Sequence, residues 1–106
     1  MRRYDHLEKG FSEAIAFARG TVGVWRGDLA AGILVQAEVL AERTAQYADL
    51  CDLEQVLNLW VAANNLLRLS GEIAPEMKEH IGRARQGALM ETADGLRGCM
   101  SKEGKP

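Results

Sequence analysis

The fold of this chain is decided around residues 49–67, which read DLCDLEQVLNLWVAANNLL. Asp52 is a good N-cap residue, because its carboxylate can accept a hydrogen bond from a free backbone N–H of the helix that follows. Gln55 stands three residues later, as a capping box requires. These signals predict a turn at about residues 50–52 and a new helix that begins directly after Asp52.

Before this turn, apolar residues recur at helical spacing through the whole first half of the chain. Placed at 100° per residue they stay within an arc of roughly 80°, which predicts one long helix, or two nearly collinear ones, over about residues 4–50. Gly20, Gly23 and Gly27 weaken this helix, since each glycine costs a helix interior up to about 1 kcal/mol, and a kink or short break is plausible there. The recurring positions are Tyr4, Leu7, Phe11, Ile15, Ala18, Val22, Trp25, Leu29, Ile33, Leu40, Tyr47 and Cys51.

The second half carries its own apolar seam, with steps that alternate between three and four residues. It predicts a second helical arm over about residues 53–95. Pro75 interrupts the seam and predicts a kink or short break near residues 71–75, with the proline in the first turn of the next segment. The pattern fades beyond Ala93, and a frayed tail is expected over residues 99–106. The seam consists of Val56, Leu59, Ala63, Leu66, Ser70, Ile73, Met77, Ile81, Ala84 and Ala88.

Two arms of similar length on either side of one turn predict an all-α fold for residues 1–106, a single domain built as a long antiparallel helical hairpin. Folding the chain at residue 51 would place Gly20 opposite Gly82, and Gly32 opposite the Ser70–Gly71 pair. Small residues at these positions would allow the two backbones to approach closely.

The helix that follows the turn has more apolar surface than a hairpin can cover. Between Leu53 and Leu67 the apolar side chains span roughly 220° of the helical wheel, whereas a surface helix needs a stripe only somewhat wider than about 100°. The extra face must meet a second copy that completes a four-helix bundle, another hydrophobic surface, or a different protein. The expected binding or oligomer face comprises Trp25, Leu29, Leu53, Val56, Leu57, Trp60, Val61, Leu66 and Leu67.

Composition narrows the class of protein. The chain has 106 residues and a formal net charge of −2, which gives no sign of a nucleic-acid surface. Its longest apolar stretch, residues 29–35, is much shorter than the roughly 20 residues that span a bilayer, and its N-terminus lacks the pattern of a signal peptide. Cys51 and Cys99 form no metal or redox spacing, so reduced thiols in a cytoplasmic protein are expected.

A search for catalytic or metal-binding residues finds no active site, no metal site and no cofactor motif. His6 and His80 are the only histidines, and Glu76 with His80 forms a single i, i+4 pair that is typical of a surface contact. Cys51 has no nearby histidine that could act as its base. We therefore expect a protein that is not an enzyme. The polar residues Asn64, Asn65 and Arg68 fall within or beside the apolar arc, as buried contacts between helices or as solvated side chains.

The chain from about Phe11 to Arg97 resembles the phasins, small helical proteins that coat polyhydroxyalkanoate granules in bacteria. The resemblance rests on three stretches: WRGDLAAGILVQAEVLAERTAQYADL at 25–50, CDLEQVLNLWVAANNLLRLSGEI at 51–73, and PEMKEHIGRARQGALMETADGL at 75–96. It implies a protein without catalytic activity that adsorbs to a polyester surface through amphipathic helices and associates with itself. The broad apolar arc of residues 53–67 separately predicts a homodimer or homotetramer that buries Trp60, because one hairpin cannot cover that arc. The resemblance also implies a cytoplasmic location, with association to granules.

Two further classes of function also fit the sequence. One is a self-assembling helical module that binds another protein, as an adaptor, chaperone or cargo subunit. The other is a small helical enzyme.

Overall fold

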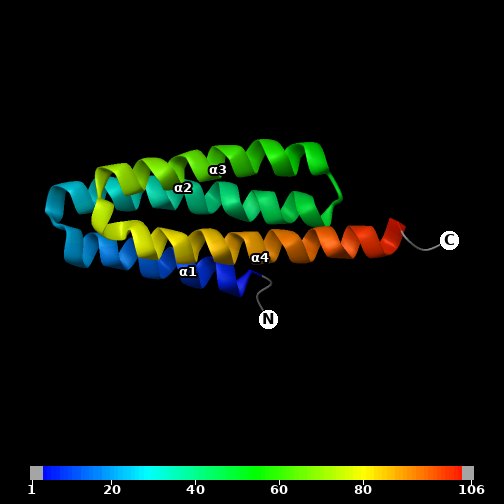
Figure 1. Ribbon diagram of the computed structural model, residues 1–106, viewed down its shortest axis with the longest axis horizontal. Helices are drawn as coiled ribbons and strands as arrows, with labels where there is room; N and C mark the ends of the chain where they lie inside the picture. Colours follow the sequence, from blue (N-terminus) through cyan, green and yellow to red (C-terminus); the bar gives the residue numbers. More distant parts are fainter. Residues whose placement is uncertain (1–3, 104–106) are drawn as a thin grey trace.

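The computed structural model describes residues 4–103, which form the expected all-α fold. Four α-helices pack side by side within one chain, and each runs antiparallel to the one before it (Figure 1). No strand occurs between residues 4 and 103. The helices are α1 (Asp5–Phe17), α2 (Val24–Asp49), α3 (Leu53–Ile73) and α4 (Lys78–Glu103), with a π-helical turn at Ala18–Val22 and a 3-10 turn at Pro75–Met77.

The first half of the chain is not one long helix, which corrects the expected arm over residues 4–50. The π-helical turn is followed by Gly23, whose φ of 122° lies in a region that favours glycine because glycine has no Cβ. The chain reverses there, and α2 packs back against α1. The long hairpin is therefore not confirmed; the chain builds a bundle of four α-helices from residues 4–103 by itself.

The predicted turn between α2 and α3 is present, and backbone hydrogen bonds define it. The N–H of Asp52 donates to the carbonyl of Tyr47 (3.0 Å), and the N–H of Cys51 donates to that of Ala48 (3.1 Å). Cys51 has a φ of 63°, the left-handed conformation in which helices commonly end, so these bonds form a Schellman motif. The predicted N-cap is confirmed as well, because the Asp52 carboxylate accepts from the N–H of Gln55 (3.2 Å).

Asp52→Ala should lower the free energy of unfolding by about 0.5–2 kcal/mol, because α3 would lose its side-chain N-cap. Urea unfolding followed by circular dichroism measures this change. Glu54→Ala is the matched control, since Glu54 also lies in the first turn of α3 but does not cap it. Equal losses in the two variants would contradict the capping role of Asp52.

The interruption near Pro75 is larger than the expected kink. α3 ends at Ile73, Pro75 lies in the first turn of the next segment as predicted, and α4 then runs back in the opposite direction (Figure 1). Arg26 of α2 stabilises this reversal. Its guanidinium donates to the carbonyl of Ile73 (3.1 Å) and forms two bonds with the Glu76 carboxylate (2.7 and 3.1 Å). The hydrogen bonds that the Glu76 carboxylate accepts from Arg26 are the largest cause of its low pKa, which falls to about 2.

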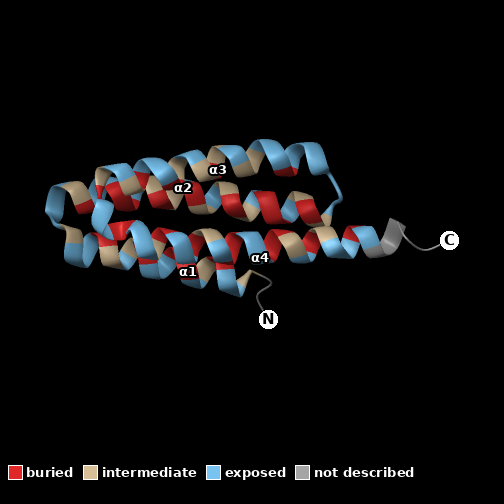
Figure 2. Cartoon of the chain, viewed as in Figure 1, coloured by how far each residue is buried: buried red, intermediate tan, exposed pale blue. Residues whose placement is uncertain are grey.

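The core is built largely from small side chains on α2, which contacts each of the other three helices. Figure 2 shows the buried positions along the inner faces of the bundle. Alanine lets helix axes approach closely, which suits a chain in which only 6% of residues are aromatic. The buried α2 residues are Gly27, Ala30, Ala31, Leu34, Ala37, Ala41, Thr44, Ala45 and Ala48, and the largest fully buried side chains elsewhere are Phe11, Leu7, Leu67 and Met77.

The expected helix register is close to correct for α2 against α3 and wrong elsewhere. The Ser70 hydroxyl donates to the carbonyl of Ala30 (3.2 Å), two residues from the Gly32 position expected to face it. Gly20 and Gly82 do not pack closely on anything, since a Cβ at either would meet no atom within 4 Å. The expected pairing of these two glycines assumed a single hairpin, and the reversals at Gly23 and near Pro75 place them differently.

A disulfide joins Cys51, in the turn between α2 and α3, to Cys99 near the end of α4. The expectation of two reduced thiols is therefore wrong for this structure. The cysteines stand 48 residues apart and form no motif, and the bundle brings their Cα atoms to 5.5 Å. Disulfides persist mainly in oxidising compartments, so the cysteines no longer support a cytoplasmic location.

α4 also continues helically to Glu103, where a frayed tail was expected, and residues 104–106 lie outside the described part of the chain.

Candidate functional site

No cluster of ligating side chains is present in the described part of the chain. Between residues 4 and 103, no three His, Cys, Asp or Glu residues could together hold a metal ion. Glu76 and His80 each contact a different residue. Glu76 binds Arg26, and the His80 ring stacks on the Phe17 ring with 4.1 Å between the two ring centroids. Glu76 therefore links the turn before α4 to α2 by an exposed ion pair, and the His80 ring packs α4 against α1.

The structure divides the nine residues of the predicted apolar face into three groups. Val56 and Leu67 are buried in the bundle, and Trp60 and Leu66 are partly buried against its core. The second group is exposed on α3, and the third is exposed at the start of α2. The exposed members are Leu53, Leu57 and Val61 on α3, and Trp25 and Leu29 on α2.

The two exposed groups do not form one surface. Trp25 and Leu29 lie beside Val24 at the start of α2, where they border a shallow pocket of about 380 Å³. Leu53 lies at the start of α3, which is the opposite end of the bundle (Figure 1). One chain therefore does not present the predicted residues as a single face, because the exposed α3 residues and the region around Trp25 lie apart.

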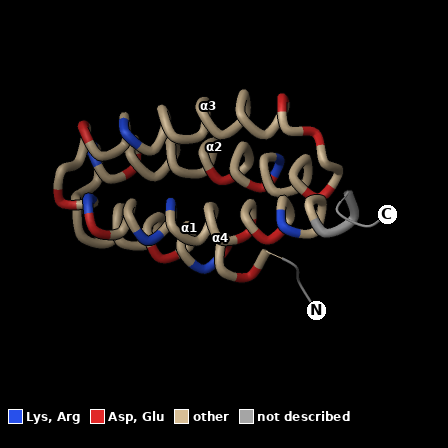
Figure 3. Tube along the Cα trace, turned by 45° about the vertical axis from the view of Figure 1, so that its right-hand side comes forward, with Lys and Arg blue, Asp and Glu red and all other residues tan. Residues whose placement is uncertain are grey.

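The three exposed α3 residues of the predicted face lie along one side of the helix and are here called the α3 stripe: Leu53, Leu57 and Val61. They are spaced by four residues and have 56%, 57% and 58% of their surface exposed. No charged residue occurs between Gln55 and Leu67, and Figure 3 shows the middle of α3 without charge. Leu50, in the preceding turn, extends the exposed apolar surface beyond the helix.

Residues of α4 that the sequence reasoning missed add to this surface. Leu96 and Met100 line a pocket of about 260 Å³ together with Leu53 and the disulfide of Cys51 and Cys99. Leu89, two turns before Leu96, is also exposed. The spacing of Leu89, Leu96 and Met100 by seven and four residues is helical, and it could have revealed one face of α4. The glycines and charges around these residues masked that signal.

The polar residues within or beside the apolar arc of α3 have different roles in the structure. Asn64 connects two helices, because its carbonyl oxygen accepts from Nε of Arg85 on α4 (2.8 Å). Asn65 is exposed, and Arg68 is an exposed side chain that pairs with Glu72 on the same helix (2.7 Å). The sequence left two alternatives for these residues, a contact between helices or a solvated side chain. Asn64 makes a contact between helices, and Asn65 and Arg68 are solvated.

The fold and this surface define the chain as a small all-α bundle that leaves an uncharged apolar helix face exposed. No helix between residues 4 and 103 combines the length and apolar character needed to cross a membrane. No family model, curated protein or solved structure matches the chain.

Proposed function

We propose that the protein is a non-catalytic, phasin-like coat protein that binds the surface of polyhydroxyalkanoate granules through the α3 stripe. The observation that carries this proposal is the exposure of Leu53, Leu57 and Val61 on a helix with no charge between Gln55 and Leu67. A helix that faces only water normally carries charged residues on its outer side. The resemblance of the sequence to phasins names the polyester as the surface.

The energetics suit reversible adsorption. The exposed parts of the α3 stripe and Leu50 amount to a few hundred Å², and burial contributes roughly 25 cal/mol per Å². The gross gain is on the order of 5–10 kcal/mol, part of which offsets the loss of translational and rotational freedom. One bundle would therefore bind weakly, and several copies side by side would hold a coat in place. The charged side chains, which lie outside the α3 stripe and give the chain a net charge of −2, would then face the solvent.

Self-association as a dimer or tetramer is part of the same proposal. In the protein free of granules, pairing of two α3 stripes would bury Leu57 and Val61 and cover the remaining surface of Trp60, and this pairing would have to open before the stripe could contact a granule. Because each chain already forms four helices, such a dimer would join two bundles, where the sequence had suggested two hairpins completing one.

A second candidate function, a helical adaptor, is favoured by the pocket beside the disulfide. A recess of about 260 Å³ lined by Leu53, Leu96 and Met100 is large enough for an apolar side chain of a partner. Recognition of an amphipathic helix commonly uses such a recess next to an exposed apolar face. In this alternative the partner would be a defined protein.

Leu57→Asp combined with Val61→Asp should abolish most adsorption to polyhydroxybutyrate particles, because two charges would have to be desolvated at the contact. Both residues are exposed, so the helices should remain folded by circular dichroism. Cosedimentation with the particles measures adsorption, and sedimentation velocity of the same samples reports oligomer size. The matched control is Gln36→Glu with Gln46→Glu, which adds the same charge at exposed positions of α2.

Adsorption of the wild-type protein should survive high salt, since apolar burial is not screened as charge pairs are. Equal adsorption of the two double variants would contradict the role of the α3 stripe, and loss of adsorption in moderate salt would show a charge-driven contact. Absence of adsorption together with a stable complex with one protein would favour the adaptor.

A further inference from the structure

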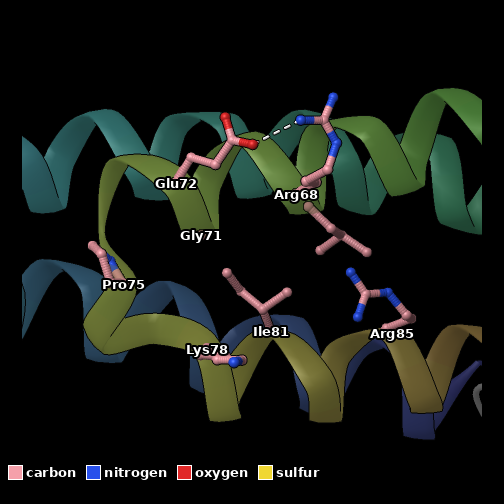
Figure 4. Close-up of a pocket in the computed structure, with 8 residues that line it drawn as sticks. Arg68, Gly71, Glu72, Pro75, Lys78, Ile81 and Arg85 are labelled. Carbon is pink, nitrogen blue, oxygen red and sulfur yellow. Dashed lines mark hydrogen bonds and ion pairs between the residues drawn. The ribbon is translucent and has the colours of Figure 1, made fainter.

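The gap between α3 and α4 offers little surface to a ligand. Ile81 points from α4 toward α3 in Figure 4, and a Cβ at Gly71 would lie 3.3 Å from its Cδ1. Leu67 is fully buried and Ile81 is only 5% exposed, so the chain itself covers the apolar wall of this gap. The apolar surface that the chain leaves uncovered lies elsewhere, on the α3 stripe and on the outer side of α2.

The outer side of α2 repeats with the spacing of a coiled coil. Seven of its nine exposed residues follow one another at alternating steps of four and three. This spacing keeps one stripe of a helix directed at a partner helix, whereas the opposite side of α2 already faces the core of its own bundle. We call these seven residues the α2 heptad face: Trp25, Leu29, Gly32, Gln36, Val39, Arg43 and Gln46.

The α2 heptad face carries little charge for a surface that meets only water. Trp25 is 77% exposed, and Leu29 and Val39 are 44% and 45% exposed. Arg43 is the only charged member of the face, and no residue of the segment 29–37 is charged. Because a helix side in contact with water alone normally carries charged residues, this composition indicates a contact surface.

Gly32 indicates that another helix approaches this face closely. Glycine destabilises the interior of a helix relative to alanine, and Gly32 lies well inside α2. No packing within the described chain requires it, since it is exposed and a Cβ there would meet no atom within 4 Å. At Gly10, by contrast, a Cβ would lie 2.9 Å from Cα of Ala84, so that glycine serves a contact inside the bundle. A partner outside the chain would give Gly32 the same role.

One antiparallel register matches this face to itself. The two series of heptad positions alternate across an antiparallel contact, so a residue of one series faces a residue of the other. With the twofold axis beside residue 34, Leu29 of one copy faces Val39 of the second copy, which joins the two most apolar positions in the middle of the face. Gly32 then faces Gln36 of the second copy, and the missing side chain leaves room for the long one.

Other pairings of the same face oppose unlike groups. Moving the axis to between residues 37 and 38 would place Leu29 against Gln46 and Gly32 against Arg43. Parallel pairing in register would place Arg43 against Arg43, and like charges across an interface repel each other. The antiparallel register beside residue 34 is therefore the favoured one.

The same register gives Arg43 a binding site on the second copy, because it faces Trp25 there. Trp25 borders a hollow of about 380 Å³ together with Val24, Asp28 and Leu29. A guanidinium in this hollow would stack on the indole ring and lie beside the Asp28 carboxylate, and both contacts favour a cation. Neither Arg43 nor Asp28 forms an ion pair with any residue between 4 and 103 of its own chain.

We propose that the α2 heptad face binds the same face of a second copy, antiparallel, about a twofold axis beside residue 34. This contact does not use α3, so two chains joined through α2 keep both α3 stripes free. It is independent of granule binding, and on a granule it would hold neighbouring bundles side by side. The face spans roughly 32 Å of helix at about 1.5 Å per residue, which is a small interface, so the pairing is reversible and depends on protein concentration.

Gly32→Arg should weaken self-association at least tenfold, because a large charged side chain would separate the helices and lose its hydration. Gly82→Arg is the matched control, since it makes the same change at an exposed α4 glycine whose added Cβ would also meet no atom within 4 Å. Both changes are made in the variant Leu57→Asp with Val61→Asp, which excludes pairing through the α3 stripe. Sedimentation equilibrium up to millimolar protein measures association, and circular dichroism checks the fold. Equal association of the two variants, or a parent that stays monomeric at millimolar concentration, would overturn the proposal.

Cross-linking tests the register. Leu29→Cys combined with Val39→Cys should let a short bismaleimide join two copies, because these positions face each other. The native cysteines do not react, since they are paired in the disulfide. Neither single variant should be joined, because two copies of the same position would lie about 15 Å apart along the contact. Joining of Leu29→Cys alone would show parallel pairing, and no joining of the double variant would show that α2 does not pair; either result contradicts the proposal.

Granule adsorption and α2 pairing can fail independently of each other. Gln36→Glu with Gln46→Glu retains the α3 stripe and should still adsorb to polyhydroxybutyrate particles, but it places like charges near the twofold axis and should lose the cross-link. Leu57→Asp with Val61→Asp should show the reverse, with adsorption lost and the cross-link retained. Retention of the cross-link in the first variant, or its loss in the second, would overturn the α2 contact whatever the result for adsorption.

Discussion

Replacing Cys51 and Cys99 together by alanine should lower the free energy of unfolding by about 4 kcal/mol. The disulfide closes a loop of 48 residues, and a cross-link over such a loop removes conformational entropy from the unfolded chain by about this amount. A small bundle with a total stability of about 5–15 kcal/mol would lose a large part of it. The native helices should remain, since the bond joins elements that α2 already holds together.

Urea unfolding of the oxidised protein, the protein reduced by a dithiol, and the double alanine variant measures this effect. The reduced protein and the variant should unfold at similar urea concentrations, well below the oxidised protein. Reduced protein is the sharper comparison, because it keeps the residue at Cys51, where φ is 63°, and the side chain of Cys99. Identical unfolding of oxidised and reduced samples would show that the cross-link does not contribute.

Gly87→Ala should destabilise the bundle by roughly 1–3 kcal/mol, the usual cost of overpacking a core. A Cβ at this position would lie 2.5 Å from the carbonyl oxygen of His6 and 3.3 Å from Cα of Leu7, so it would meet the backbone of α1. Backbone cannot change rotamer, and α1 would have to move away from α4. The loss should therefore appear as a lower melting temperature and as faster exchange of the α1 amides.

The control for this prediction lies on the same helix. Gly82 is exposed, and a Cβ there would meet no atom within 4 Å, so Gly82→Ala should stabilise the protein by roughly 0.5–1 kcal/mol through helix propensity alone. The two variants make the same chemical change with opposite expected signs. A gain in stability for both would mean that α1 does not pack against α4 at Gly87.

Local signals in the sequence correctly predicted the features that depend on neighbouring residues. The Asp52 cap, the turn at residues 50–52 and the position of Pro75 each involve hydrogen bonds or steric limits within a few residues. The helical class followed from apolar spacing, which depends only on the 3.6-residue turn. The antiparallel pairing of α2 with α3 followed from the short turn between them, since two long helices joined in this way must lie side by side.

The reversals at Gly23 and near Pro75 could not be predicted from the same spacing. A helix that stops for one residue and restarts can keep its apolar residues in phase, so the pattern does not report whether the axis continues or turns back. The π-helical turn before Gly23 also carries no motif of its own. The number of helices was therefore decided by tertiary packing, in which α1 covers α4 and α2 contacts all three partners.

For the candidate site too, the sequence determined some features and the tertiary structure decided others. The sequence by itself determined that α3 has too broad an apolar surface and no charge between Gln55 and Leu67. Only the tertiary structure decided that Val56 and Leu67 belong to the core while Leu57 and Val61 face outward, because this depends on where α2 and α4 lie around α3. Pairing of cysteines 48 residues apart has the same origin: side chains distant in sequence meet only after the helices have packed.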